Sequence, residues 1–313
     1  MGSGGWRRPS TGFVLLVLAG VLWGTTGVAA NGVFGRTELS PLATAWLRFA
    51  VATPVILVVG LRSMGRGLLR MPVRTHAVLA GIGVLIFLCQ VLYLQAISEV
   101  GVTVATLVML CGIPLMVAAI SAVVLGERLG RAMWVSLALA VTGTALLVVG
   151  KPEGGAADGS LVLGVLLAVA SAGAAAVFTL GSRVLNRRAD PLQISAVSFL
   201  GGLVVFAPVT ATGGFTLDLP AGGWLLILYL GVVTQGVAFL MFQRALQTET
   251  ATMASVVTLL EPLVAAVLAW VFFDERLGAV SWGGAGLLIG ALALLTVATT
   301  RGGEAGVVVA PAD

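Results

Sequence analysis

Charge is scarce in this 313-residue chain. Only 10% of its residues are Asp, Glu, Lys or Arg, whereas 59% are hydrophobic. A typical soluble domain carries roughly 25% charged residues, so a water-soluble fold of this composition could not cover its surface with polar groups. The mean hydropathy of +1.10 points the same way. The composition therefore excludes an ordinary soluble domain and predicts that lipid surrounds much of the chain.

Cysteine and histidine are nearly absent as well. Cys89 and Cys111 lie in apolar runs and His76 is the single histidine, which gives no disulfide framework and no metal-ligand spacing. The chain also lacks a Walker A sequence, an HExxH motif, a dinucleotide fingerprint and a lipase-type nucleophile motif. We therefore expect no cofactor, no metal and no enzymatic activity. The net charge of +4 is expected to orient the protein in a membrane, not to bind nucleic acid.

The chain does contain a series of long apolar runs. A membrane-spanning helix needs roughly 20 such residues, and backbone groups in lipid must be hydrogen-bonded internally, so these runs are expected to be helices. The sequence thus predicts an all-α integral membrane protein with ten transmembrane helices, at 11–30, 41–61, 75–97, 103–125, 130–150, 160–182, 192–212, 222–246, 251–273 and 279–300.

Basic residues indicate how these helices are oriented. If the N-terminus lies inside, thirteen of the 17 basic residues fall in inner segments, three in outer loops, and Arg48 within a span. Cytoplasmic loops carry an excess of Lys and Arg. We therefore predict a multi-pass protein of the cytoplasmic (inner) membrane with both termini on the cytoplasmic side, the tail at 301–313 included.

An internal repeat divides the chain. The segment PLMVAAISAVVLGERLG begins at Pro114 and resembles PLVAAVLAWVFFDERLG, which begins at Pro262, at an offset of 148 residues. The two units, 11–150 and 159–300, would each hold five helices, and an odd number gives consecutive units opposite orientations. The prediction is an inverted repeat, as in many secondary transporters with a substrate site near mid-membrane. A duplication retained only for stability is the alternative.

These features together resemble a known family. The two five-helix halves, LWG at 22–24, P…GERLG at 114–130 and EPLVAAVLAWVFFDERLG at 261–278 resemble the drug/metabolite transporter superfamily, in its ten-helix branch with two EamA-type domains. The resemblance covers about residues 11–300. It implies transport of a small metabolite, often amino-acid-like, through a central cavity by alternating access, and it leaves the substrate open.

Glu261 is the main candidate for a functional residue, because it lies about ten residues, roughly 15 Å, into the ninth run. Charge near the bilayer centre costs roughly 2.5–3.5 kcal/mol on insertion scales and marks functional sites. Glu261 could bind a coupling proton or contact a substrate amine; a structural ion pair or hydrogen bond is the alternative. Pro262 should free the carbonyl of Thr258 and kink this helix, as Pro114 should kink the matching helix.

Arg48 is the second charged candidate. It could snorkel outward, pair with Glu261 or bind a substrate carboxylate. Polar side chains in lipid need partners, so several further residues are expected to face inward and line the site. These are Ser255 and Thr258, on the face of Glu261, with Trp23, Asn31, Gln90, Tyr93, Gln235, Phe239 and Gln243. A site rich in amides and aromatic rings suits a neutral or zwitterionic ligand.

The combined prediction is a secondary transporter of an amino-acid-like or drug-like metabolite, with efflux as the expected direction. The expected partners are the small-molecule substrate, the lipid bilayer and, if Glu261 couples transport, protons; the oligomeric state stays open. A channel of the same fold is one alternative, and saturable exchange would separate it from a carrier. A membrane enzyme is the other, and the missing catalytic motifs disfavour it.

Overall fold

The computed structural model describes residues 10–124, 126, 130–149, 160–211, 218–273 and 278–300. Every regular element in these ranges is helical, with η1 a 3₁₀-helix and η2 a π-helix. In chain order they are α1 (Thr11–Gly24), α2 (Thr26–Phe34), α3 (Pro41–Met64), η1 (Gly65–Leu69), α4 (Val73–Val124), α5 (Arg131–Val149), α6 (Leu161–Leu185), α7 (Pro191–Ala211), α8 (Ala221–Tyr229), η2 (Leu230–Val237), α9 (Ala238–Ala245), α10 (Ala251–Val257), α11 (Leu260–Phe273) and α12 (Ala279–Thr300). The expected tail at 301–313 lies outside the described residues.

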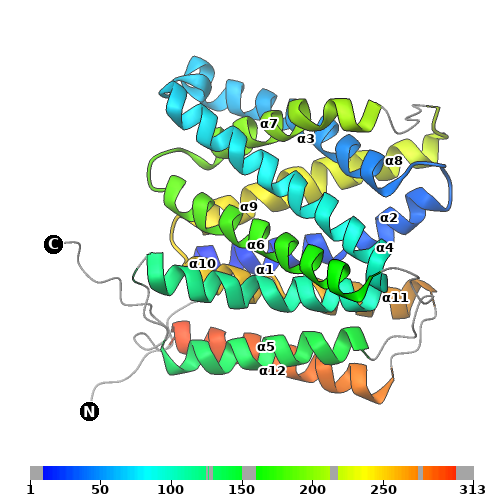
Figure 1. Ribbon diagram of the computed structural model, residues 1–313. Coiled ribbons are helices and arrows are strands. Elements are labelled where there is room, and N and C mark those ends of the chain that lie inside the picture. Colours follow the sequence, from blue (N-terminus) through cyan, green and yellow to red (C-terminus); the bar gives the residue numbers. More distant parts are fainter. Residues whose placement is uncertain are drawn as a thin grey trace, which may run out of the picture.

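The helices have the lengths that a membrane requires. Within the described ranges, nine segments are long and apolar enough to cross a bilayer, and the remaining expected span contains a shorter apolar helix, Arg131–Leu147. This confirms the predicted all-α membrane protein. The start of α1 and the end of α12 lie at the same end of the bundle (Figure 1), as an even number of crossings requires.

Three of the expected spans are interrupted. The first is divided at Thr25 into α1 and α2, the eighth contains the π-helix η2, and the ninth is divided at Thr258 and Leu259 into α10 and α11. Two other expected spans, the third and fourth, form the single element α4, which turns at Gly101. The φ angle of Gly101 is 80°, a conformation that favours glycine over other residues.

The fifth helices of the two expected repeats, α5 and α12, lie side by side at one face of the bundle (Figure 1). Their backbones approach closely, because a Cβ atom added at Gly143 would lie 2.7 Å from the carbonyl oxygen of Gly284. Small residues permit such close packing in lipid, where the hydrophobic effect does not drive helices together.

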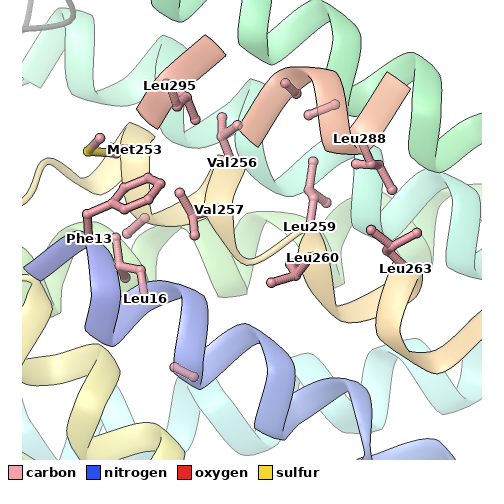
Figure 2. Packing of buried hydrophobic residues seen from close by; sticks show 14 of the residues in the cluster. Phe13, Leu16, Met253, Val256, Val257, Leu259, Leu260, Leu263, Leu288 and Leu295 are labelled. Carbon is pink, nitrogen blue, oxygen red and sulfur yellow. The ribbon is translucent and has the colours of Figure 1, made fainter. Parts of the chain in front are cut away.

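A buried apolar cluster holds the interrupted ninth span in place. Figure 2 shows Val257 and Leu260, which flank the gap between α10 and α11, and Leu259, which lies in it, among side chains from α1 and α12. Phe13 of α1 and Leu288 of α12 belong to the same cluster. The gap is therefore packed against two neighbouring helices and has a fixed position in the fold.

Candidate functional site

A cavity of about 530 Å³ lies between the helices of the two expected repeats. Small-molecule sites are typically about 300–1,000 Å³. Its walls come from α1 to α5 in the first half and from α6, η2, α9 and α11 in the second half. The polar and charged side chains in the lining are Thr26, Arg48, Cys89, Gln90, Tyr93, Thr106, Gln235 and Glu261. The cavity is therefore large enough for a metabolite and offers it few polar groups.

A smaller cavity of about 130 Å³ adjoins the first. Both are lined by a shared ring of residues, which consists of Trp23, Leu110, Ile113, Ala175, Phe178 and Glu261. Beyond this ring the small cavity is lined by Ser255 and Thr258, and by Pro114 of α4. The two cavities thus share the residues of this ring, and Glu261 borders both.

Most of the residues expected at the site meet around these cavities. Seven of them line the large cavity: Trp23, Arg48, Gln90, Tyr93, Gln235, Phe239 and Glu261. Pro262 also lines it, whereas Ser255, Thr258 and Pro114 line the small one. Asn31 and Gln243 line neither. Asn31 is exposed near the end of α2, and Gln243 is fully buried elsewhere.

Gln243 links α9 to α6 through side-chain hydrogen bonds. Its Oε1 accepts from Nδ2 of Asn186 at 2.8 Å, and its Nε2 donates to Oγ of Ser182 at 3.1 Å. The sequence predicted that the Gln243 amide faces inward. Its hydrogen-bond partners belong to the neighbouring helix α6 and its C-cap, and the amide does not line the cavity. The bonds lie near the C-terminal ends of α6 and α9.

Arg48 is held by two consecutive residues of the π-helix. Its Nη2 donates to Oε1 of Gln235 at 3.2 Å and to Oγ1 of Thr234 at 3.4 Å. Neighbouring residues of a regular α-helix point in directions about 100° apart, so the wider π-helical turn helps both to reach one guanidinium group. The hydroxyl of Thr234 itself donates to the Leu230 carbonyl oxygen at 2.8 Å, which leaves its oxygen to accept from Arg48.

Trp23 joins the break in the first span to the same π-helix. Its Nε1 donates to the carbonyl oxygen of Thr234 at 2.9 Å, and its ring lies 5.3 Å from the ring of Phe242. The register of the backbone hydrogen bonds changes at the end of a π-helical turn. Such turns are frequent at functional sites. Nearby, the Thr25 hydroxyl contacts the Tyr229 hydroxyl at 2.7 Å. The interruptions at Thr25 and in η2 are therefore tied together.

Glu261 is the second residue of α11, immediately after the gap. Its backbone N–H donates to the carbonyl oxygen of Thr258 at 2.9 Å, so the carbonyl that Pro262 cannot bond is satisfied by a tighter turn. Pro262 lies in the first turn of α11, where a missing N–H costs little. A negative charge is also favourable at a helix N-terminus. The gap therefore gives the Glu261 carboxylate a helix end within the membrane.

The Glu261 side chain faces the cavity. Among the described residues it makes no hydrogen bond and no ion pair. It interacts electrostatically with Arg48 across the cavity, and its charge also acts on Cys89 and Tyr93. Both Glu261 and Arg48 are partly exposed, as side chains that face a cavity should be.

Cys89 and Thr106, which line the large cavity, and Thr234, which holds Arg48, were not among the sequence candidates. Tyr93 is hydrogen-bonded to Thr106, which lies on the far side of the turn at Gly101, and Cys89 contacts Oγ of Ser171 at 3.4 Å. Thr234 holds Arg48 but lies next to Gln235 in the chain. Helical periodicity assigns such adjacent residues to different faces, so only the π-helix reveals Thr234. Thr106 becomes visible only when the turn brings the two parts of α4 together.

A helical membrane bundle with a cavity between two related halves is the architecture of a membrane transport protein. Comparison with known proteins identifies the family of transport proteins. The model of the EamA-like transporter family matches residues 10–149 and again 162–297. The chain therefore belongs to the EamA-like transporter family, and it carries two copies of the family unit.

Individual relatives agree with this assignment. The uncharacterised transporter YwfM of Bacillus subtilis is 26% identical over 294 residues, which cover 92% of this chain and 94% of that protein. An uncharacterised transporter of Archaeoglobus fulgidus is 28% identical over 282 residues, which cover 90% and 95%. A solved crystal structure with 24% identity has a TM-score of 0.78 and covers 94% of this chain and 99% of its own, so it shares the fold.

Proposed function

We propose that this protein is a secondary transporter that exports a small amino-acid-like or drug-like metabolite across the cytoplasmic membrane by alternating access. The observation that carries the proposal is the cavity of about 530 Å³ between the two halves, with Arg48 from the first half and Glu261 from the second in its wall. Membrane-embedded charges that face a cavity mark substrate or ion pathways.

The helix interruptions support a substrate site at this level. The break at Thr25 lies beside Thr26, η2 contributes Gln235, and the gap before α11 precedes Glu261; these three residues line the large cavity. Irregular backbone within a membrane is tolerated where it is buried in protein or lines a cavity. Transporters place substrate sites at such discontinuous helices, which also supply points where the two halves can bend.

The matched glutamines Gln95 and Gln243 support alternating access. They occupy equivalent positions of the two repeats at an offset of 148, and an inverted repeat would place them at opposite ends of the bundle. Gln243 is buried in hydrogen bonds to Asn186 and Ser182, whereas Gln95 is exposed. Gln243 thus joins α9 to α6 in a polar network, whereas Gln95 is exposed at the matched position. We infer that the halves rock, so that the two ends of the bundle open and close in turn.

Glu261 is the residue through which protons would be coupled to transport. It is the only carboxylate in the wall of the large cavity as the described residues define it, and it borders the smaller cavity as well. A carboxylate with access to two chambers can exchange a proton with each in turn. A channel of the same fold would use the same residues without a closed state, so the two functions must be separated by their kinetics.

Counterflow in sealed proteoliposomes tests the proposal. A thermal-shift screen of the purified protein against amino acids, nucleosides and cationic drugs selects the solutes to be tested. A carrier takes up labelled solute faster when the same unlabelled solute is inside, and its rate saturates. Flux that rises linearly without stimulation from the opposite side would indicate a channel. If no screened solute crosses the membrane faster than in protein-free liposomes, the transport proposal fails.

A further inference from the structure

Six exposed arginines lie on or beside two short connections at one end of the bundle (Figure 1). The connection between α3 and α4 carries four of them and the connection between α6 and α7 carries two: Arg62, Arg66, Arg70, Arg74, Arg187 and Arg188. We call these six side chains the arginine surface. Within the described ranges none of them makes an ion pair or a side-chain hydrogen bond. One carboxylate, that of Asp190, lies on the same connections, so the surface has a strong excess of positive charge.

A buried side chain, that of Gln193 near the start of α7, fixes the two connections to each other. Its Nε2 donates to the carbonyl oxygen of Gly67 in η1 at 2.9 Å, and its Oε1 accepts from the backbone N–H of Asp190 at 3.0 Å. Met71 and Ala189, one from each connection, pack in the same apolar cluster. The arginines of both connections therefore belong to one surface, although 126 residues separate Gly67 from Gln193.

The arginine surface lies at the boundary of the membrane-spanning segments. One apolar span extends to Leu69 and the next begins at Val73, so residues 70–72 alone separate them. Leu68 is fully buried, whereas Leu69 and Val73 are 51% and 84% exposed. The stem of an arginine at such a boundary can lie along apolar surface while its charge reaches the polar layer. The first anions that these guanidinium groups meet are therefore the phosphates of the surrounding lipids.

Neither the connection itself nor the orientation of the protein accounts for this arrangement. The segment 212–220 occupies the same place in the second repeat, between its second and third expected spans, and it contains no basic residue. Arginine is thus not a general requirement for joining these two spans. Basic residues orient a membrane protein through their number on each side, which does not require two connections to be bonded together. The fixed arrangement of six like charges instead fits a ligand outside the chain.

We infer that the arginine surface binds the headgroups of anionic phospholipids, with Leu69 and Val73 against the acyl chains. This inference goes beyond the proposed transport function and does not depend on it. A guanidinium group donates in parallel to two oxygens of a phosphate. Clusters of roughly four to eight Lys or Arg residues next to a membrane span attract anionic lipids. A soluble acidic partner would meet the same charges but would leave the two apolar side chains uncovered.

Lipid binding to the purified full-length protein tests this inference. The protein is kept in a neutral detergent and titrated with dioleoylphosphatidylglycerol, which is anionic, or with dioleoylphosphatidylcholine, which has the same acyl chains and no net charge. Native mass spectrometry counts the bound lipids and gives the Kd of the first one. We expect phosphatidylglycerol to bind about 10-fold or more tightly than phosphatidylcholine. Equal Kd values for the two lipids would overturn the inference.

Paired substitutions on each connection test whether the two act as one surface. R66Q/R70Q and R187Q/R188Q should each weaken the binding of phosphatidylglycerol about fivefold or more and leave that of phosphatidylcholine unchanged, because each pair removes two charged donors from the same surface. All four residues are exposed, so both variants are expected to fold, and thermal unfolding checks this. If either pair could be removed without effect on phosphatidylglycerol binding, the joint surface would be wrong.

The matched control is R36Q/R131Q, which removes the same amount of charge from two exposed positions outside the arginine surface. It should keep the wild-type Kd for phosphatidylglycerol, and an equal loss in this control would mean that net charge alone attracts the lipid. A polyglutamate peptide represents a soluble acidic partner. If this peptide binds the wild-type protein more tightly than phosphatidylglycerol does, the surface fits a protein partner and the inference is wrong.

Discussion

The matched prolines of the two halves show how a repeated element has become unequal. Pro114 lies within α4, and the α-helix continues through it. Pro262 lies in the first turn of α11, after a gap that separates it from α10. The residues before the prolines differ as well, since Ile113 stands where the second half has Glu261. Both Ile113 and Glu261 belong to the ring shared by the two cavities.

This difference shows what the gap contributes. In the interior of a helix, proline removes one hydrogen bond but adds no helix end that faces the cavity. In the second half the gap creates a new N-terminus inside the membrane, and its dipole favours the negative charge of Glu261. The first half thus supplies an apolar wall and the second half a charged one at equivalent positions. An asymmetric ligand, with different groups to place, is recognised better by unequal halves than by identical ones.

The largest effect is expected where the two halves differ in charge. Glu261→Gln should reduce transport about 100-fold, which corresponds to roughly 2.7 kcal/mol, because it removes the carboxylate through which protons would be coupled to transport. Ile113→Leu, a volume-conserving change at the matched position, should leave the rate within about threefold. Initial rates of counterflow across a pH series measure both effects. If the Gln variant kept the wild-type rate and pH dependence, Glu261 would have no role in coupling.

The two prolines should respond unequally to replacement by alanine. Pro262→Ala restores an N–H group that can extend the helix across the gap, so we expect transport to fall about 10-fold while the protein stays folded. Pro114→Ala only adds a hydrogen bond to a helix that is already continuous, and its transport rate should change less than about threefold. Counterflow and thermal unfolding are measured on both variants. Equal losses of transport would show that the gap has no special function.

The spans and the main site residues were predictable because their signals are strong. Long apolar runs have few structures open to them in lipid, and the fold agrees with the expected runs. Arg48 and Glu261 stood out because charge is rare inside spans, and both face the same cavity. The match between the segments that begin at Pro114 and Pro262 indicated two related units, which the double match to the family model supports.

The interruptions were not predictable, because they depend on contacts between distant segments. The break at Thr25 is tied to Tyr229 by a hydrogen bond, and the π-helix η2 is bonded to Trp23 and Arg48. Nothing in the local composition of either segment demands an irregular turn. The geometry of the turn determines which side chains reach Arg48, so Thr234 was not among the sequence candidates.

A second limit concerns polar residues that find other partners. Gln243 was expected at the cavity because an amide in lipid must be hydrogen-bonded. That reasoning predicts a partner but does not identify it, and the partners proved to be Asn186 and Ser182. Asn31 is exposed near the end of α2 instead. Requirements for hydrogen bonding therefore restrict where polar residues lie without choosing between a cavity and a neighbouring helix.

Substitution of the matched glutamines should give the smallest difference between the two halves. We expect that difference in the free energy of unfolding more than in the transport rate. Gln243→Leu removes hydrogen bonds to Asn186 and Ser182 that join α9 to α6. Such interhelical bonds in membrane proteins are worth about 0.6 kcal/mol on average and up to about 1.7, so we expect a loss near about 1 kcal/mol. Gln95→Leu alters an exposed side chain and should change stability by less than about 0.5 kcal/mol.

Reversible unfolding of both variants in the same detergent measures this difference, because the detergent environment is then a common reference. If the buried network closes one end of the bundle, Gln243→Leu should also weaken that closure. A cysteine placed at Ser255, in a chain whose free Cys89 and Cys111 are replaced by alanine, should then react faster with a water-soluble cysteine reagent. Ser255 lines the small cavity and is itself buried, so its labelling rate reports opening directly. The two variants could instead show equal unfolding free energies and equal labelling rates. Gln243 would then stabilise the bundle no more than Gln95 does, and the matched positions would give no support for alternating closure.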